Sequence, residues 1–150
     1  MALQAGDKAP EFESIGQDGN PIKLSDFKGK KLVMYFYPKD NTPGCTAESC
    51  DLRDNYERFL KLGYEVIGVS TDSARSHRKF IDKFELPFSL VADEDKSVHE
   101  KYGTWQEKQM YGRKYMGTVR TTFIIDEEGV ISEVIGKVKT KAHTAQILGE

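Results

Sequence analysis

Hydrophobic residues gather in four short runs along the chain, separated by longer stretches in which polar and apolar positions mix. Each run is largely apolar at consecutive positions, and not only at every second one. This pattern is typical of a strand that is buried on both faces of a sheet. We therefore expect four central strands, at residues 32–37, 65–70, 88–92 and 121–125.

The segments between these runs carry apolar residues at the three- and four-residue spacing of helices. The first predicted helix covers residues 46–62 and ends at Gly63, and the second follows Ser73, a suitable N-cap. Shorter helices are expected at residues 97–102 and from about residue 141 onward. We expect the three histidines on the polar, solvent-facing sides of their helices: His77, His99 and His143.

Turn signals complete the fold prediction. Residues 11–15 and 21–24 flank a turn with Gly and Asn, which predicts an N-terminal β-hairpin, and residues 130–135 are expected to pair antiparallel with the fourth buried strand. A long polar segment, residues 104–119, has no predicted element. Strands that alternate with helices and end in a hairpin indicate an α/β, thioredoxin-like fold with a central mixed β-sheet flanked by helices. Without repeats or linkers, residues 1–150 are expected to form one domain.

Composition and charge narrow the function classes. Charged residues make up 31% and hydrophobic residues 38% of the 150 residues, and the net charge is only −2. Interspersed charges of both signs do not favour binding to nucleic acid or to a membrane surface. No signal peptide is visible, and no apolar stretch approaches the ~18–20 residues that span a bilayer. We therefore expect a cytoplasmic protein whose cysteines serve chemistry rather than structural disulfides.

The only two cysteines, Cys45 and Cys50, follow the first buried strand at the start of the first long helix. The N-terminus of a helix stabilises a thiolate, which is the reactive form. A free thiol with a pKa of about 8.5 is only roughly 3% ionised at pH 7, so ionisation raises the reactive fraction at most about 30-fold. Because a lower pKa also weakens the nucleophile, the net gain is only a few-fold. A fast thiol enzyme therefore needs polar groups around its sulfur.

Several residues supply such groups. Pro43 and Gly44 place Cys45 on a turn whose exposed backbone N–H groups can point at one ligand. Thr42 offers a hydroxyl three residues before the thiol. Arg120 directly precedes the fourth buried strand and would lie near the end of the sheet in the expected fold. An arginine there would stabilise the thiolate and a departing oxygen together.

The spacing of the two cysteines limits what they can form. On one regular helix, residues five apart are separated by a rise of ~7.5 Å, point ~140° apart, and have Cα atoms more than ~8 Å distant. A disulfide needs Cα atoms within roughly 7 Å. Cys45 and Cys50 therefore cannot bridge without unwinding of the helix, which favours a redox switch over a static cross-link. A buried core role for Cys50 stays open, and a zinc site is disfavoured because no second cysteine pair is present.

The residues around Cys45 resemble those of a known family. The pattern Pro38-x3-Thr42-x2-Cys45 is similar to the active-site signature of the peroxiredoxins, and residues 37–50 resemble the bacterioferritin comigratory protein (peroxiredoxin Q) subfamily. The resemblance implies a thioredoxin-like fold and a thiol-dependent peroxidase. It extends over nearly the whole chain, with further motifs at residues 6–12, 108–117 and 120–126.

The resemblance also implies roles for individual residues. Cys45 would be the peroxidatic cysteine, and its sulfenic acid would condense with Cys50, the resolving cysteine, to an intramolecular disulfide. Thr42 and Arg120 would activate the peroxide and hold the thiolate, and Glu48 would organise Arg120. Two further residues would support the site: Pro38 and Gly44.

By the same resemblance, the substrates would be hydrogen peroxide and small organic hydroperoxides, and thioredoxin or a similar dithiol protein would be the reductant. No metal, haem or flavin is implied, and the protein would be a monomer. A general thiol–disulfide oxidoreductase is disfavoured because such enzymes typically use Cys-x-x-Cys, whereas a redox-sensing or chaperone-like interaction protein remains an alternative. Four aromatic residues fit a hydroperoxide pocket, a reductant-docking surface or simple packing: Tyr102, Trp105, Tyr111 and Tyr115.

Overall fold

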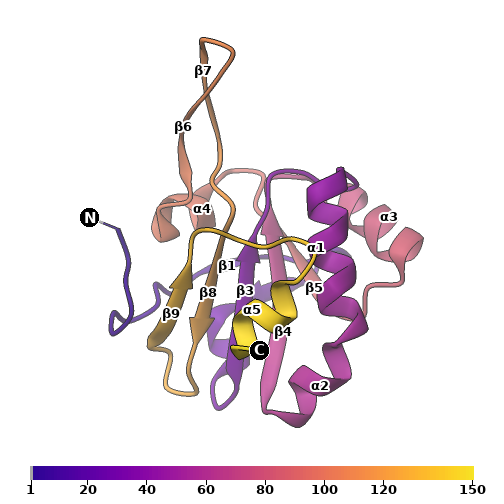
Figure 1. Cartoon of the computed structure of the whole chain (residues 1–150), viewed down its shortest axis with the longest axis vertical. Coiled ribbons are helices and arrows are strands. Elements are labelled where there is room, and N and C mark those ends of the chain that lie inside the picture. Colours follow the sequence, from indigo (N-terminus) through magenta and orange to yellow (C-terminus); the bar gives the residue numbers. More distant parts are fainter. Residues whose placement is uncertain (1) are drawn as a thin grey trace.

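A five-stranded sheet forms the centre of the protein in the computed structural model, which describes residues 2–150 (Figure 1). Its strands are Lys31–Phe36 (β3), Tyr64–Ser70 (β4), Ser89–Ala92 (β5), Thr121–Ile125 (β8) and Ile131–Ile135 (β9). They lie in the order β5-β4-β3-β8-β9; β3, β4 and β5 are parallel, whereas β8 is antiparallel to both β3 and β9. The expected central mixed sheet is confirmed, and so is the antiparallel partner of the fourth buried strand.

Side chains of β3 alternate between two hydrophobic cores, one on each face of the sheet. Leu32 and Phe36 belong to one core, and Val33 and Tyr35 belong to the other, which also contains Cys45. Because β3 is the middle strand, both of its faces are covered, and it has to be apolar at consecutive positions. This explains the uninterrupted hydrophobic run from which the strand was predicted.

Helices cover both faces of the sheet (Figure 1). Their bounds are Leu24–Phe27 (η1, a 3-10 helix), Pro43–Asp54 (α1), Tyr56–Lys61 (α2), Ala74–Phe84 (α3), Ser97–Tyr102 (α4) and His143–Leu148 (α5). Helices α1, α2, α3 and α5 contribute to the core that contains Cys45, whereas η1 and α4 contribute to the other core. None of the helices in residues 2–150 has the length and apolar character needed to cross a bilayer.

The first long helix differs from its expected bounds. It begins at Pro43, three residues earlier than expected, and ends at Asp54, so that α2 is a separate helix. Asn55 lies between them with φ −114° and ψ 10°, and its side-chain amide donates to the carbonyl oxygen of Asp51 at 2.8 Å. Such a bond competes with the regular helical ladder and accounts for the break. The side chain of Ser73 caps α3, as expected.

The expectation that the histidines face solvent is wrong, since His77, His99 and His143 are each 0% exposed. His77 precedes Phe80 and Phe84 by three and seven residues, so it lies on the apolar face of α3. The other two histidines similarly lie beside buried residues of short helices. Each of the three rings has a hydrogen-bond partner at both nitrogens, as buried polar groups require.

Two antiparallel hairpins lie outside the central sheet. The N-terminal one confirms the expectation, whereas the second occupies the polar segment that had no predicted element and projects from the body of the molecule (Figure 1). Its turn has positive φ at Tyr111 (52°) and Gly112 (78°), as a two-residue type I′ hairpin turn requires. The strands are Glu13–Ile15 (β1), Pro21–Lys23 (β2), Trp105–Met110 (β6) and Arg113–Thr118 (β7).

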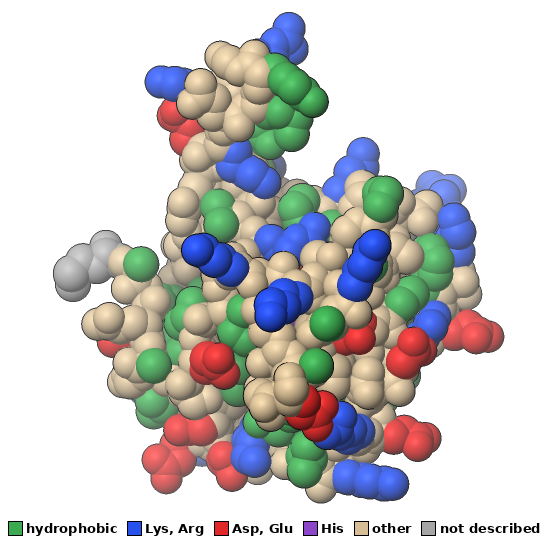
Figure 2. Space-filling view, in the orientation of Figure 1, with side chains coloured by type: hydrophobic (Ala, Val, Ile, Leu, Met, Phe, Trp, Pro, Cys, Tyr) green, Lys and Arg blue, Asp and Glu red, His purple; other side chains and the backbone are tan. Residues whose placement is uncertain are grey.

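The aromatic residues between positions 102 and 115 do not line a common pocket. Tyr111, at the tip of the second hairpin, is 98% exposed, whereas Tyr102 is buried and donates to the carbonyl oxygen of Pro10 at 2.7 Å. Trp105 packs edge-on against the ring of His99. Packing therefore accounts for Tyr102 and Trp105. Figure 2 shows hydrophobic side chains on the projecting hairpin, where four are exposed: Met110, Tyr111, Tyr115 and Met116.

The register of the sheet brings distant parts of the chain to one edge. Phe36, at the end of β3, pairs with Thr121, at the start of β8. The residues that follow Phe36 and those that precede Thr121 are therefore neighbours in space. The loop after β3 leads to α1 and Cys45, and Arg120 is the last residue before β8.

Candidate active site

Cys45 is the third residue of α1 and is only 1% exposed. Thr42 is the N-cap of this helix and has an extended backbone (φ −97°, ψ 155°). Pro43 is the first helical residue; an N–H at this position has no partner within a helix, so the proline costs no hydrogen bond. The thiol therefore belongs to the first turn of the helix, where the helix dipole favours an anion.

Arg120 connects Cys45 to Glu48. Its Nη2 donates to Sγ of Cys45 at 3.2 Å, and its Nη1 donates to Oε1 of Glu48 at 2.6 Å. No other hydrogen bond within residues 2–150 reaches the sulfur. Burial opposes the charge of the guanidinium, but the negative charges of Cys45 and Glu48 outweigh it and raise the pKa of Arg120 above its ordinary value. Arg120 therefore stays cationic beside the thiol.

Gly44 makes this close approach possible. A Cβ atom at position 44 would lie 3.2 Å from Nη2 of Arg120. The guanidinium is held between Cys45 and Glu48, so it cannot move away without lengthening a hydrogen bond. A side chain at position 44 would therefore press the guanidinium away by a few tenths of an ångström, whereas the backbone conformation there is an ordinary one.

The start of α1 also offers hydrogen-bond donors to a ligand. Among the described residues, the backbone N–H groups of Gly44 and Cys45 have no acceptor, as is usual for the first N–H groups of a helix. The hydroxyl of Thr42 donates to the carbonyl oxygen of Lys39 at 2.8 Å, so the lone pairs of its oxygen remain able to accept. The two backbone N–H groups and the guanidinium of Arg120 can therefore donate to a ligand oxygen on which negative charge develops.

Glu48 is fully buried, at 0% exposure, one helical turn after Cys45. Burial raises its pKa to about 7, although the charge and the N–H donor of Arg120 act in the opposite direction. Oε1 is bonded to Arg120, but Oε2 has no hydrogen-bond partner in the part of the chain that the structure describes. A buried carboxylate oxygen without a partner is rare and unfavourable.

Cys50 lies on the same uninterrupted helix as Cys45, and both are free thiols. Cys50 is half-buried, whereas Cys45 is almost completely buried. A rise of ~7.5 Å over five helical residues keeps the two side chains apart as long as α1 is intact. The structure therefore holds the reduced form of the pair, in which the two sulfurs are not positioned to bond.

Residues 5–134 match the AhpC/TSA family. The chain belongs to this family. It is 48% identical over 148 residues to peroxiredoxin Bcp of Bacillus subtilis, a match that covers 99% of this chain and 94% of that protein. A mutant of PrxQ from Xylella fastidiosa has a similar structure, with a TM-score of 0.92 and 32% identity over 99% of this chain and 95% of that one. The bacterioferritin comigratory protein of Xanthomonas campestris gives a TM-score of 0.87 and 36% identity, over 92% and 88% of the two chains.

These similarities confirm the expected thioredoxin-like fold and the resemblance to the Bcp (peroxiredoxin Q) subfamily. The chain is a peroxiredoxin, and thus a thiol-dependent peroxidase. The two free cysteines on α1 fit the type in which both thiols lie on one chain.

A buried polar cluster that no sequence motif indicated holds the loop between β3 and α1 of this peroxiredoxin. Pro38, half-buried, begins the loop between β3 and α1. Asp40 follows it and accepts hydrogen bonds from the hydroxyls of Tyr37 at 2.5 Å and Ser76 at 2.8 Å. Nδ1 of His77 lies 2.7 Å from Oδ2 of Asp40. The loop that ends at the N-cap of α1 is thereby tied to β3 and to α3.

The same cluster contains the candidate ligands for a metal. Among the described residues, Asp40, Asp72 and His77 are the set whose ligand atoms lie within 4.8 Å of one another. Asp72 accepts the backbone N–H of Asp40 at 2.8 Å, and Nε2 of His77 lies 2.8 Å from the carbonyl oxygen of Val91. Their ligand atoms are thus engaged in hydrogen bonds, and a metal would have to replace them. His77 lies three residues before Phe80, and this helical spacing from a large apolar residue is the sequence signal that could have identified His77 as buried.

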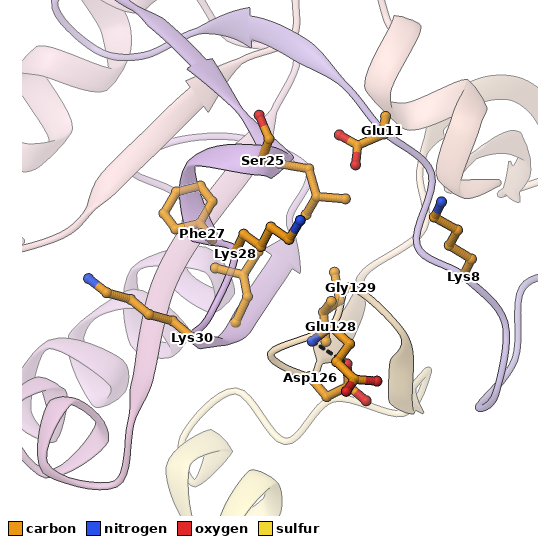
Figure 3. Close-up of a pocket in the computed structure, with 12 residues that line it drawn as sticks. Lys8, Glu11, Ser25, Phe27, Lys28, Lys30, Asp126, Glu128 and Gly129 are labelled. Atoms are coloured by element: carbon orange, nitrogen blue, oxygen red, sulfur yellow. Dashed lines mark hydrogen bonds between the residues drawn. The ribbon is translucent and has the colours of Figure 1, made fainter.

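A cavity of about 200 Å³ lies elsewhere in the peroxiredoxin (Figure 3). It is lined by Leu32 at the start of β3 and by Ile125 at the end of β8. These are the strand ends opposite to those near Cys45 and Arg120, so the cavity is separate from the thiol site. Its charged lining is of mixed sign: Lys8, Lys28, Lys30, Glu11, Asp126 and Glu128.

Proposed function

We propose that Cys45 is the peroxidatic cysteine of this peroxidase, and that its substrates are hydrogen peroxide and small organic hydroperoxides. The observation that carries the proposal is the 3.2 Å hydrogen bond from Arg120 to the sulfur of Cys45. A cation and a helix N-terminus both favour the thiolate over the thiol. The bacterioferritin comigratory protein of Xanthomonas campestris has alkyl peroxide reduction activity, which supports the inclusion of organic hydroperoxides.

In the first step, the thiolate of Cys45 attacks the hydroxyl oxygen of the peroxide. A sulfur–oxygen bond forms and the O–O bond breaks, and the sulfur is oxidised by two electrons to a sulfenic acid. The leaving oxygen takes up from solvent the proton that the Cys45 thiol released on ionisation, which gives water or an alcohol. Arg120 and the backbone N–H groups of Gly44 and Cys45 donate to the peroxide oxygens as negative charge develops on them. The oxygen of Thr42 accepts a hydrogen bond from the peroxide hydroxyl, because its own proton is donated to Lys39.

In the second step, the thiol of Cys50 attacks the sulfur of the sulfenic acid. A disulfide bond forms between Cys45 and Cys50, the sulfur–oxygen bond breaks, and hydroxide leaves as water with the proton of the Cys50 thiol. Both cysteines lie on α1, so at least its first turns must unwind before the sulfurs can meet.

In the third step, thioredoxin or a similar dithiol protein reduces the disulfide by thiol–disulfide exchange and is itself oxidised to a disulfide. The cycle needs no cysteine from a second copy of the chain. We therefore propose a monomer with one domain over residues 1–150. Two cysteines that cycle between thiols and a disulfide suit a reducing compartment, and this supports a cytoplasmic location.

Rapid mixing of the reduced protein with an equimolar amount of hydrogen peroxide tests these assignments. Wild type and Cys50→Ser should be oxidised rapidly, and Cys45→Ser should not react at the same rate. The mass of quenched samples should show one added oxygen on Cys50→Ser and an intramolecular disulfide in wild type. If Cys50→Ser forms no sulfenic acid and wild type forms no internal disulfide, the resolving role of Cys50 is wrong.

A redox-sensing or chaperone-like interaction protein would behave differently in the same experiment. Its thiols would be oxidised slowly, because signalling needs no transition-state stabilisation by Arg120. A catalytic assay with excess peroxide and a dithiol reductant completes the distinction. Repeated turnover that depends on Cys45 is expected, and oxidation without turnover would favour the sensor.

A further inference from the structure

Glu48 has a second buried neighbour besides Arg120. His143 is the first residue of α5, which packs against α1, and it is 0% exposed. Its Nε2 lies 3.4 Å from Oε2 of Glu48, the carboxylate oxygen that has no hydrogen-bond partner among residues 2–150. Two buried polar atoms therefore face each other without a defined hydrogen bond.

Gln146 determines which nitrogen of His143 carries a proton. Its Oε1 accepts the backbone N–H of Lys139 at 2.9 Å, and its Nε2 donates to the carbonyl oxygen of Lys137 at 2.7 Å. These two contacts fix the orientation of the side-chain amide, because its nitrogen only donates and its oxygen only accepts. Oε1 of Gln146 also lies 3.0 Å from Nδ1 of His143, so Nδ1 must be the donor.

The other nitrogen of His143, Nε2, is therefore an acceptor whenever the ring is neutral. It lies 2.8 Å from the hydroxyl oxygen of Thr122, which can donate to it. Toward Glu48 the neutral ring offers no N–H, and an ionised Oε2 presents only lone pairs. Such a contact is unfavourable between side chains that are both 0% exposed unless a proton lies between the two atoms. One proton, on Oε2 or on Nε2, removes the conflict.

We propose that His143 is a positioning residue of the peroxidase site, in which it shares one proton with Glu48 and so leaves the charge of Arg120 available to Cys45. This inference rests on the proposed role of Cys45. With the shared proton present, Glu48 and His143 together have no net charge, whichever of them carries it. Without that proton, the carboxylate balances the guanidinium, and the thiolate loses electrostatic support.

The charged and titratable groups around the pair support this state. Burial raises the pKa of Glu48 to about 7, against the influence of Arg120, and burial lowers the pKa of His143. Asp51 on α1 raises both pKa values, and Tyr35 on β3 is kept neutral because burial raises its pKa. A neutral carboxyl group beside a neutral ring is therefore the favoured arrangement just below pH 7.

The test measures the ionisation of Cys45 in the reduced Cys50→Ser protein, from the pH dependence of its alkylation by iodoacetamide. His143→Gln cannot take up the proton, and its amide N–H can donate to Oε2, which favours the ionised form of Glu48. The midpoint of the profile should rise by about one pH unit, because one more negative charge lies near the sulfur. Glu48→Gln imposes the opposite state, a neutral side chain whose oxygen still accepts from Arg120, and its midpoint should not rise.

Ile147→Ala is the matched control, because Ile147 is a buried residue on the same helix without a titratable group. It loosens α5 and should leave the midpoint unchanged. The proposal is overturned if His143→Gln has the wild-type midpoint, or if His143→Gln and Glu48→Gln raise it equally, since that is the pattern of a merely structural role.

A carbon-13 spectrum of the Glu48 carboxyl group gives a second readout. In the wild-type chain its signal should titrate at about pH 7, and a titration near the ordinary value of about 4.3 would also overturn the proposal. Failure of the proposed function is distinguishable from these outcomes, because Cys45 would then react slowly with peroxide whatever the alkylation profile shows.

Discussion

The guanidinium of Arg120 lies 3.2 Å from the sulfur of Cys45, although 75 residues separate them in the chain. The same guanidinium is bonded to Glu48, so its position is determined from two sides. An arginine held in this way can stabilise first the thiolate and then the leaving oxygen, without reorganisation between the two.

Replacing Arg120 by lysine should slow the oxidation of Cys45 by about 100-fold or more. A lysine ammonium is a compact point charge and lacks the planar fork that lets Arg120 donate to Cys45 and Glu48 together. Loss of one preorganised donor to a developing oxyanion lowers a rate by about 10²–10³. The measurement is the second-order rate constant with hydrogen peroxide in a stopped-flow instrument. Arg75→Lys, at an exposed position of α3, is the control. A loss of only a few-fold would mean that Arg120 acts through thiol ionisation alone.

Gly44→Ala should reduce the rate of peroxide reduction at least about tenfold without lowering stability. The new Cβ would press on Nη2 of Arg120, while alanine itself favours the helix by roughly 0.5–1 kcal/mol over glycine. Oxidation rate and urea denaturation are measured on the same preparation. Gly136→Ala serves for comparison, because a Cβ there would have no neighbour within 4 Å. An unchanged rate in Gly44→Ala would show that the guanidinium can shift freely.

Asp40→Ala should lower the free energy of unfolding by about 2–4 kcal/mol, because it leaves the buried donors of Tyr37, Ser76 and His77 without their acceptor. It should also slow peroxide reduction, since the loop that carries Thr42 is no longer held. Urea denaturation gives the first effect and stopped-flow oxidation the second. Asp82→Ala removes a carboxylate that is 66% exposed, and it should change stability by less than about 0.5 kcal/mol. Equal effects of the two substitutions would contradict the structural role of Asp40.

Protonation of the buried Glu48 should make the protein more stable at mildly acidic pH than at neutral pH. Burial raises its pKa from 4.5 to about 7, so between these values the folded chain binds a proton that the unfolded chain has released. The contribution of Glu48 to the free energy of unfolding therefore rises as the pH falls from 7 to 4.5, by roughly 3 kcal/mol. Glu48→Gln should lack this component. Urea denaturation of both proteins at several pH values in this window checks it, and identical pH dependence would mean that Glu48 is ionised throughout.

Formation of the disulfide between Cys45 and Cys50 should unwind the first turns of α1. Amide hydrogen exchange within residues 43–54 should therefore speed up when wild type is oxidised by one equivalent of peroxide. Cys50→Ser, oxidised in the same way, retains the helix and should keep its protection. Unchanged exchange in the oxidised wild type would mean that the two sulfurs meet by another rearrangement.

The central strands could be predicted because a strand covered on both faces has to be apolar at consecutive positions, as β3 is. The β6–β7 hairpin could not, because most of its side chains are exposed on both faces and leave no alternation to detect. The histidines were misplaced for another reason. Their residue type suggests solvent, whereas their position beside Phe80, Tyr102 or Ile147 on a helix face indicates burial.

By itself, the sequence determined the chemistry of the first turn of α1, because Thr42, Gly44 and Cys45 interact over a few residues and their geometry follows from local helix formation. The sequence also predicted Arg120 near the thiol, from the expected fold and the resemblance, but only the tertiary structure decided the distances between the charged groups. Arg120 reaches it through the pairing of β3 with β8, and His143 reaches Glu48 through the packing of α5 on α1. Coulombic interaction and the loss of water depend on distance in space and on burial, and neither can be derived from spacing along the chain.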